Sequence, residues 1–330
     1  MKENEIRPKK LLDSYLKIAD NDIEKYFNDS GEFRNVGCPA CGSRKNTDEF
    51  VKRKFKYKRC IICKTLFVSP RPAPGLIDKY YRQSESAKFW ASVFYRKTEK
   101  ARRRKLFKPK ARLLMKFAEE HGVNGGKFVD IGAGYGTFCE EVKRLDFMKE
   151  VYALEPSVYL AEECRKKGLE VIESTIEGIG GKYRGCFDFA VALELFEHSY
   201  SPERFMRSVR NVLRKGGYFV FTTLNGLGWD ILVLGRDSKS VSPPHHLNFI
   251  NPEAVEILAG RTGWEVVKVF TPGKLDVDIV YNFHKDNPGI KLDGFTEYLV
   301  SQDENKKELF QKFLVKNLMS SHLWAILKRS

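Results

Sequence analysis

Apolar and polar positions follow two regular patterns in the second half of the chain, from residue 127 onward. Short apolar runs with the character of buried strands alternate with segments whose apolar residues recur at helical spacing. Strands are predicted at 127–131, 151–155, 169–172, 187–193, 218–224, 264–270 and 322–329, and helices at 137–145, 157–167, 202–213, 252–260 and 293–317. Strands that alternate with helices indicate a parallel sheet covered on both faces, a Rossmann-like, doubly wound α/β/α sandwich.

Local signals mark the ends of several of these elements. Ser201 and Asn251 each precede a proline, an arrangement typical of a helix start in which the polar side chain caps the first turn. Gly216-Gly217 is expected to end the helix before it and to turn the chain into the next strand.

The first third of the chain has a different pattern. A helix is predicted over 10–30 because five apolar side chains fall on one side, namely Leu12, Tyr15, Ala19, Ile23 and Tyr26. The prolines of SPRPAPG (69–75) indicate a linker between a strand-rich segment and a basic helical one. We therefore divide the chain into an N-terminal helical segment, a ribbon, a basic helical bridge and a sheet-containing domain, at 1–34, 35–70, 71–121 and 122–330.

Composition narrows the class of protein. The 330 residues are 42% hydrophobic and 13% aromatic, which suits a folded core and argues against a disordered chain. The formal charge of +15 favours acidic partners such as phosphates. We find no apolar stretch long enough to span a membrane, and no apolar segment behind MKENEIRPKK that would act as a secretion signal. We expect a cytoplasmic protein.

Four of the seven cysteines form two Cys-x-x-Cys pairs separated by 18 residues: Cys38, Cys41, Cys60 and Cys63. Two such turns can direct four thiolates at one ion, which predicts a structural zinc site with no open coordination position. The alternatives are a redox pair or four ordinary thiols. An odd number of cysteines also favours a reducing compartment over a disulfide framework.

The segment KFVDIGAGYGTF (127–138) leads from a predicted buried strand into a helix through Gly132, Gly134 and Gly136. Glycines at this place allow a tight turn and let a ligand approach the backbone at the helix start. Glu155 lies 19 residues beyond Gly136 at the end of the next strand, where a carboxylate can bind both ribose hydroxyls. Thr137 occupies the third glycine position of a dinucleotide fingerprint, which favours an adenosyl ligand without pyrophosphate. The alternative is a tight turn of structural value only.

Four segments in this order resemble the core motifs of class I S-adenosylmethionine-dependent methyltransferases, over about residues 127–270: VDIGAGYGTF, YALEPS, FDFAVALELFEH and VLRKGGYFVFTT. The ribbon followed by FVSPRP, with the later PHHLNFINPEAVEIL and GWEVV, resembles a subgroup that pairs a zinc ribbon with this fold. That subgroup is associated with methylation of sugars or surface glycans, near the deoxysugar C-methyltransferases.

The resemblance implies a cofactor, S-adenosylmethionine, and a set of residues that bind it. Asp130, Gly132 and Gly134, with Gly136, would line its methionine part. Glu155, followed by Pro156, would hold the ribose, and Ile176 would border the adenine. Leu193-Glu194 would close the cofactor site from the end of the fourth strand.

Three histidines lie in segments expected at the carboxyl edge of the sheet, where ligands bind in such folds. His198 follows the fourth strand, and His245 and His246 lie in the long connection after the fifth. Removal of a proton from the acceptor suits a histidine base. The alternatives are a structural hydrogen-bond donor or, for the pair that follows Pro243-Pro244, a lid holder.

The run from Arg96 to Lys116 contains eleven basic residues and only one acidic residue, Glu99. It forms either a solvated helix face or a contact for phosphates, of a nucleotide-linked sugar or of a nucleic acid. The pattern as a whole predicts methyl transfer to oxygen or carbon of a small acceptor, a sugar or phosphate-bearing glycan intermediate. The alternatives are an RNA or protein methyltransferase that grips a macromolecule with the ribbon and the basic helix, and a binding module without catalysis.

Overall fold

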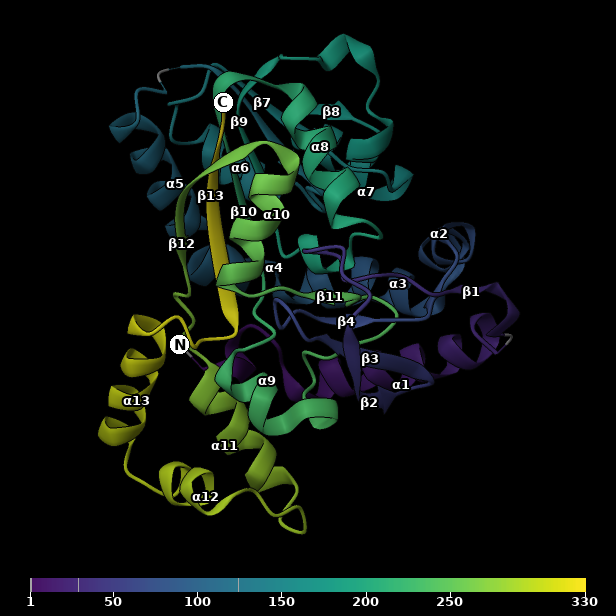
Figure 1. Cartoon of the computed structure of the whole chain (residues 1–330). Helices are drawn as coiled ribbons and strands as arrows, with labels where there is room; N and C mark the ends of the chain where they lie inside the picture. Colours follow the sequence, from purple (N-terminus) through teal and green to yellow (C-terminus); the bar gives the residue numbers. More distant parts are fainter. Residues whose placement is uncertain (1, 29, 124) are drawn as a thin grey trace.

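The computed structural model describes residues 2–28, 30–123 and 125–330, and a seven-stranded sheet forms its centre (Figure 1). The strand order is β12-β13-β10-β9-β6-β7-β8, and the strands from β10 to β8 are parallel. β13 runs antiparallel to both β10 and β12. The strands are β6 (Lys127–Ile131), β7 (Glu150–Leu154), β8 (Glu170–Ile172), β9 (Phe187–Leu193), β10 (Leu213–Leu224), β12 (Trp264–Phe270) and β13 (His322–Arg329). The expected α/β sandwich is confirmed, with one reversed strand.

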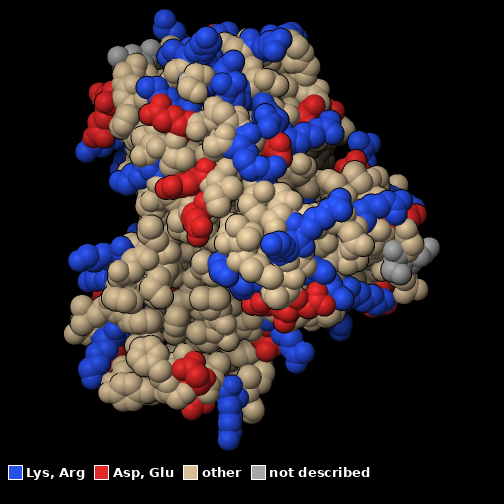
Figure 2. Space-filling view, viewed as in Figure 1, with Lys and Arg blue, Asp and Glu red and all other residues tan. Residues whose placement is uncertain are grey.

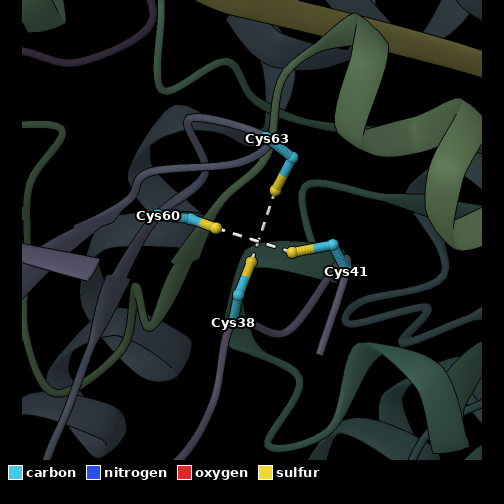
Figure 3. A group of neighbouring side chains, drawn as sticks. All are labelled: Cys38, Cys41, Cys60 and Cys63. Atoms are coloured by element: carbon cyan, nitrogen blue, oxygen red, sulfur yellow. Dashed lines mark hydrogen bonds between the residues drawn. The ribbon is translucent and has the colours of Figure 1, made fainter. Parts of the chain in front are cut away.

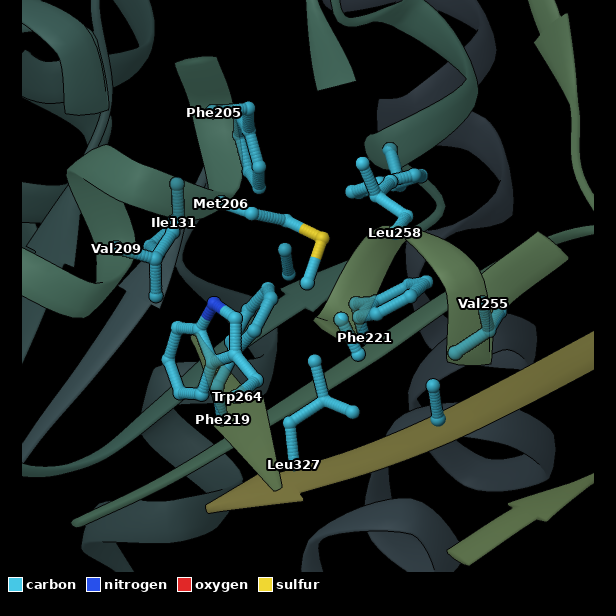
Figure 4. Packing of buried hydrophobic residues seen from close by; sticks show 14 of the residues in the cluster. Ile131, Phe205, Met206, Val209, Phe219, Phe221, Val255, Leu258, Trp264 and Leu327 are labelled. Carbon is cyan, nitrogen blue, oxygen red and sulfur yellow. The ribbon is translucent and has the colours of Figure 1, made fainter. Parts of the chain in front are cut away.

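Helices cover both faces of this sheet. α8 (Pro202–Val212) and α10 (Pro252–Thr262) pack on one face, and α5 (Lys108–Glu120), α6 (Thr137–Lys143) and α7 (Val158–Lys166) pack on the other. Successive strand residues point to opposite faces, so Phe219 and Phe221 enter the first core and Val220 enters the second. Figure 4 shows Met206 and Leu258 facing these phenylalanines. Each buried aromatic or aliphatic side chain contributes about 1.5–3 kcal/mol.

The predicted helix caps are present and one predicted turn is wrong. Ser201 accepts a hydrogen bond from the Arg204 N–H, and Asn251 accepts one from the Ala254 N–H. α8 ends at Val212 without help from the glycine pair. Gly216, with φ of 75°, instead lies inside β10, where the pairing with β9 shifts register between Leu213 and Tyr218.

The N-terminal part consists of α1 (Lys9–Tyr26) and a ribbon. The ribbon strands β2 (Asn46–Lys52), β3 (Phe55–Cys60) and β4 (Leu66–Val68) are joined by β11 (Asn248–Phe249) in one antiparallel sheet of order β11-β4-β3-β2. The ribbon therefore shares a sheet, and a buried cluster that includes Tyr57 and Phe249, with the connection after β10.

Segment 69–75 is not a linker, because its arginine is fixed in the interior. Arg71 is 1% exposed and donates from Nη1 to the Tyr200 carbonyl oxygen at 2.7 Å and from Nη2 to Asn248 Oδ1 at 3.2 Å. β5 (Arg71–Pro72) pairs with β1 (Phe33–Arg34). A proline-rich stretch can therefore pack tightly when one of its own side chains, here Arg71, is buried and hydrogen-bonded.

The basic bridge is a nearly continuous helical path rather than one regular helix. It comprises α2 (Pro74–Gln83), α3 (Glu85–Phe89), α4 (Arg96–Arg102) and α5, with π-helical turns η3 (Trp90–Tyr95) and η4 (Arg103–Phe107) before and after α4. π-helical turns widen a helix locally and often occur beside functional sites.

Four helices between residues 229 and 316 form a separate lobe, which lies near the N-terminus and away from the C-terminus in Figure 1. It contains α9 (Trp229–Leu234), α11 (Asp276–Asp286), α12 (Gly294–Val300) and α13 (Glu304–Lys316) around buried residues such as Trp229, Val280 and Leu314 (Figure 1). The helix predicted over 293–317 is interrupted between α12 and α13, and α9 and α11 were not predicted. In the described part of the chain, no helix combines the length and the apolar character needed to cross a membrane.

Candidate functional site

The glycine loop and its acid meet at the carboxyl edge of the sheet. Gly132, Gly134 and Gly136 have φ of 73°, 57° and 67°, the left-handed region that favours glycine. The Gly134 N–H donates to Glu155 Oε2 at 2.8 Å, and the Ser157 N–H donates to Glu155 Oε1 at 3.0 Å. The loop and the acid that follows β7 are therefore in direct contact.

The loop is packed on its inner side and open on its outer side. A Cβ atom at Gly136 would lie 2.6 Å from Leu169 Cδ1, and one at Gly132 would lie 2.8 Å from Leu195 Cδ2. A Cβ atom at Gly134 would meet no atom within 4 Å. The backbone of Gly134, next to the Glu155 carboxylate, is the part of the loop that a ligand can approach.

Two buried acids accompany the loop. Burial raises the pKa of Glu155 to about 7, although the backbone N–H groups of Ser157 and Gly134 lower it. Burial also raises the pKa of Asp130 to about 7, while the Cys139 thiol, 3.6 Å away, lowers it. Asp130 lies below the loop at the end of β6, and Glu155 lies beside it.

The other predicted cofactor residues lie in three different settings. Pro156 is exposed directly after Glu155. Ile176 begins the short helix η5 (Ile176–Gly178) and is 3% exposed within the core under α8. Leu193 is half-buried at the end of β9, and Glu194 follows it with φ of 53°.

The basic bridge folds over the glycine loop, which sequence reasoning did not foresee. The Tyr95 ring stacks on Tyr135 of the loop with centroids 5.0 Å apart, and Tyr135 Oη donates to the Ala91 carbonyl oxygen at 2.7 Å. Arg103 pairs with Glu140 of α6 at 2.6 Å and with Glu99 at 3.0 Å. Part of the basic run is therefore used to hold the bridge against α6 and is not a free charged face.

Glu194 is the centre of a polar network. Its Oε1 accepts a hydrogen bond from Thr222 Oγ1 at 2.7 Å and lies 3.5 Å from Lys110 Nζ and 3.3 Å from His322 Nδ1. Burial opposes its ionisation, but His322 and Lys110 hold the pKa of Glu194 well below its ordinary value. Trp324 Nε1 donates to His322 Nε2 at 2.8 Å, so the His322 proton is assigned to Nδ1, toward Glu194.

Sequence reasoning gave His322 no role because the direction of the last strand was unknown. The antiparallel β13 begins at the carboxyl edge, where His322 pairs with Leu224. The signal that was available is a histidine at the first position of the predicted final strand, 322–329.

The three predicted histidines come together from two segments. The His198 and His246 rings have centroids 4.9 Å apart, and those of His198 and His245 are 6.1 Å apart. His198 ends the short helix η7 (Phe196–His198), and the other two precede β11. Burial lowers the pKa of His246 to about 4 and of His245 to about 3, and it lowers the pKa of His198 well below its ordinary value. All three are neutral at pH 7.

Hydrogen bonds separate the roles of these histidines. His245 uses both ring nitrogens, with Nε2 2.9 Å from Tyr80 Oη and Nδ1 3.3 Å from Tyr81 Oη. His246 Nδ1 lies 2.5 Å from the Ser240 carbonyl oxygen, which can only accept, so Nδ1 carries the proton and Nε2 has the lone pair. His246 therefore has a basic nitrogen available, and His245 does not.

Glu197 completes this group. Its Oε2 accepts a hydrogen bond from Thr223 Oγ1 at 2.8 Å, and burial together with Glu194 raises its pKa to about 8. One ligand atom each from Glu197, His198 and His246 lies within 4.8 Å of the others. Two nitrogen atoms and one carboxyl group at this spacing can move a proton or hold a divalent cation.

The four paired cysteines converge at the end of the ribbon (Figure 3). The Sγ atoms of Cys38 and Cys63 are 3.4 Å apart, those of Cys41 and Cys60 are 3.5 Å apart, and all four lie within 4.8 Å of one another. In a tetrahedron with Zn–S bonds of 2.3 Å the sulfur atoms are about 3.8 Å apart. The arrangement fits a tetrahedral metal ion. Each of the two short contacts joins a cysteine of the first Cys-x-x-Cys pair to a cysteine of the second.

A family model described as a methyltransferase domain matches residues 99–269, which is 171 of the 330 residues. The ubiquinone biosynthesis O-methyltransferase of Escherichia coli O127:H6 is 29% identical over 192 residues, covering 50% of this chain and 78% of that protein. The enzyme of the same name from Proteus mirabilis is 29% identical over 144 residues, covering 40% of this chain and 58% of that protein.

Solved structures similar to this chain include a geranyl diphosphate methyltransferase in complex with S-adenosylmethionine, at a TM-score of 0.47 and 14% identity over 72% of this chain and 92% of that one. A protein of Pyrococcus horikoshii OT3 also has a TM-score of 0.47, at 15% identity over 76% of this chain and 99% of that one. With the family model matching more than half of its length, the chain belongs to the methyltransferase-domain family and is an S-adenosylmethionine-dependent methyltransferase.

Proposed function

We propose that this methyltransferase transfers a methyl group to a hydroxyl oxygen of a small acceptor, a sugar or nucleotide-linked glycan intermediate, with His246 as the general base. The proposal rests on Nε2 of His246, which has no hydrogen-bond partner among the described residues and lies beside His198, at the sheet edge that also holds the glycine loop. Oxygen is favoured over carbon as the acceptor atom because the relatives from Escherichia coli and Proteus mirabilis are named O-methyltransferases.

The open backbone at Gly134 and the adjacent carboxylate of Glu155 fit S-adenosylmethionine. On this proposal Asp130, Gly132, Gly134 and Gly136 hold its methionine part, Glu155 and Pro156 its ribose, Ile176 its adenine, and Leu193 with Glu194 the methyl-bearing end. When bound, the cofactor supplies an activated methyl group on a sulfonium. The protein needs no nucleophile of its own, and it contributes alignment of the reacting atoms and removal of one proton.

The proton of the acceptor hydroxyl passes to Nε2 of His246 as the oxygen takes the methyl group. The Ser240 carbonyl oxygen, 2.5 Å from Nδ1, fixes the tautomer and supports the positive charge that develops on the ring. Because the buried imidazole is neutral at pH 7, its lone pair is available without prior loss of a proton. A base placed in this way typically contributes about 10²–10⁴ in rate.

An aromatic side chain near the histidines supports a sugar as the acceptor. Tyr81 is 37% exposed, and its ring centroid lies 5.3 Å from that of His245. An aromatic face with polar groups at its edge suits a ring that has one apolar face and several hydroxyl groups.

We further propose that Cys38, Cys41, Cys60 and Cys63 bind a structural zinc ion, with residues 35–70 as a zinc ribbon. Such a closed site stabilises the fold and takes no part in the reaction. The bridge (71–121) then connects this ribbon to the methyltransferase domain (122–330), and a helical segment (1–34) precedes the ribbon.

The test is transfer of labelled methyl from S-adenosylmethionine into a size-fractionated extract of the native host, with and without ribonuclease and protease. Label in a low-mass or glycan fraction that resists both enzymes supports the proposal. Label in large material that either enzyme removes points to the RNA or protein alternative.

Variants then test the base. His246→Asn should lower turnover at least 100-fold with little change in cofactor affinity. His245→Asn is the control, because it disturbs the packing of the same segment before β11 without removing the proposed base. Equal turnover in His246→Asn and the native protein would exclude the histidine as base. A divalent cation that the native protein binds in addition to the ribbon zinc, and that His246→Asn loses while it retains the zinc, would assign the histidine to a metal site instead.

A further inference from the structure

The eleven basic residues from Arg96 to Lys116 form two groups in the structure. One group faces inward, where its members pair with acids or lie on aromatic rings: Arg102, Arg103, Lys105 and Lys110. The exposed group comprises Lys97 and a set of residues at intervals of four, which we call the basic stripe: Arg96, Lys100, Arg104, Lys108, Arg112 and Lys116. Over the described residues, only Lys116 of the stripe forms an ion pair, with Glu120 at 3.7 Å. The acids near the bridge are thus used by the inward group, and the stripe keeps its charge.

The π-helical turn η4 keeps the basic stripe on one side of the bridge. In a regular α-helix, positions four apart advance by about 40° at each step, so six of them turn through about 200° and end on opposite sides. Four residues are less than one turn of a π-helix, so the stretch 103–107 reverses part of this rotation. Every side chain of the stripe is exposed, as expected of a single line about 30 Å long.

The exposed neighbours of the stripe within the bridge are aliphatic. Apart from the basic group, the exposed residues of 96–116, a stretch that the structure describes in full, are Pro109 and Leu113, and Leu113 is 51% exposed. A shallow cavity of about 220 Å³ opens beside the stripe, lined by Lys108, Arg112, Glu141, Arg144 and Leu145. Helices that lie on bilayers combine Lys and Arg with exposed apolar side chains, whereas proteins that bind single-stranded nucleic acid stack its bases on aromatic rings. The composition of this face therefore favours lipid.

The positive charge of the molecule is unevenly distributed. On the face shown in Figure 2, Lys and Arg side chains are frequent over the upper part, where the seven-stranded sheet lies, and sparse over the lower lobe with α11, α12 and α13. Residues 276–316 of that lobe contain six basic and eight acidic residues, whereas 96–116 contain eleven and one. A negatively charged surface therefore attracts the bridge far more than the lobe, which gives the molecule a defined orientation on it.

We propose that the basic stripe docks on the surface of a bilayer that contains anionic lipids, with Leu113 and Leu145 at the apolar boundary and one lipid phosphate in the cavity beside Lys108 and Arg112. A flat surface can contact all members of a straight stripe at once. Each Lys or Arg near such a surface strengthens binding by about fivefold, and the attraction falls off within a Debye length. Docking of this kind does not depend on the identity of the acceptor.

The test is cosedimentation of the full chain with vesicles of phosphatidylcholine alone and with vesicles of phosphatidylcholine and phosphatidylglycerol in equal parts. The native protein should bind the second kind and not the first, and high salt should release it. Lys100→Gln/Arg104→Gln should weaken binding about 25-fold, with an unchanged thermal melting curve.

Arg184→Gln/Arg204→Gln is the matched control, because it removes the same charge from exposed positions elsewhere. Arg204 lies on α8, on the opposite face of the sheet from α5, and Arg184 precedes Gly185, whose N–H donates to the Asn211 carbonyl oxygen at the end of α8. This control should keep the native affinity for the anionic vesicles.

Four results would overturn the docking surface. The first is failure of the native protein to bind the anionic vesicles, and the second is equal affinity in the native protein and Lys100→Gln/Arg104→Gln. Equal weakening in the stripe variant and the control would assign binding to net charge alone. Tighter binding of the native protein to single-stranded RNA than to the vesicles, lost in the stripe variant, would assign the stripe to a nucleic acid.

Discussion

Two glycines of the loop between β6 and α6 provide a matched pair, since one is packed and the other is open. We consider Gly136→Ala and Gly134→Ala. Both positions have positive φ, 67° and 57°, so both substitutions place an L-residue in the left-handed region. This conformation costs about 1–2 kcal/mol, of which a stiffer unfolded chain returns about 0.4–1 kcal/mol.

The surroundings separate the two variants. The new methyl group at position 136 would lie 2.6 Å from Leu169 Cδ1 and 2.9 Å from Cys164 Sγ, both of them buried. Overpacking of this kind adds about 1–3 kcal/mol. We expect Gly136→Ala to lower the free energy of unfolding by about 2–4 kcal/mol and Gly134→Ala to lower it by about 1 kcal/mol or less.

The order reverses for cofactor affinity, because the methyl group at Gly134 enters the open space where we propose that the cofactor lies. Gly134→Ala should weaken S-adenosylhomocysteine binding at least tenfold, measured by calorimetry, while urea denaturation reports stability. In the double variant Gly136→Ala/Leu169→Ala the clash is relieved. Its loss of unfolding free energy should therefore be smaller than the sum of the losses in the two single variants. Equal losses of stability in the two glycine variants would refute the packing argument.

Three further predictions concern other parts of the molecule. Since burial raises the pKa of Glu155 to about 7, its carboxylate ionises as the pH rises from 6 to 8, and S-adenosylhomocysteine should bind more tightly over that range. Asp130 has a pKa of about 7 as well, so Glu155→Gln should reduce this pH dependence to the part that Asp130 contributes, and an unchanged dependence would exclude Glu155 as a source. Cys60→Ser should lose bound zinc, measured by atomic emission, and melt at lower temperature, whereas Cys186→Ser should retain the metal; retention in both would rule out the proposed ligand set. Arg71→Met removes the donor to three oxygen acceptors, the carbonyl oxygens of Val68 and Tyr200 and Oδ1 of Asn248. It should cost about 2–4 kcal/mol in urea denaturation, and a loss below 1 kcal/mol would contradict the role of this arginine in joining the ribbon to the domain.

The elements that could be predicted from the sequence are those whose signals are local. Strands 127–131 and 187–193 have the predicted bounds, and the caps at Ser201 and Asn251 depend on neighbouring residues alone. The pairing of the glycine loop with Glu155 also follows from local order, because consecutive parallel strands end at the same edge.

What could not be predicted depends on contacts between distant segments. The prolines around Arg71 resemble a linker until the partners of its guanidinium are known, and these come from Tyr200 and Asn248. His322 enters the site because β13 is antiparallel, a property of the whole sheet. His245 and His246 are adjacent and chemically identical, and only their hydrogen-bond partners distinguish them.

The pairing of β11 with β4 has a consequence for the order of synthesis and folding. It joins Phe67 to Asn248, so the ribbon sheet is completed only after most of the chain has left the ribosome. Until then β4 is an edge strand with unpaired backbone groups, the kind of surface that invites pairing between chains. Closing so large a loop is slow because its entropy is lost before the contact is gained. The histidines immediately before β11 are therefore positioned late, and an incomplete chain that already has its glycine loop still lacks the proposed base.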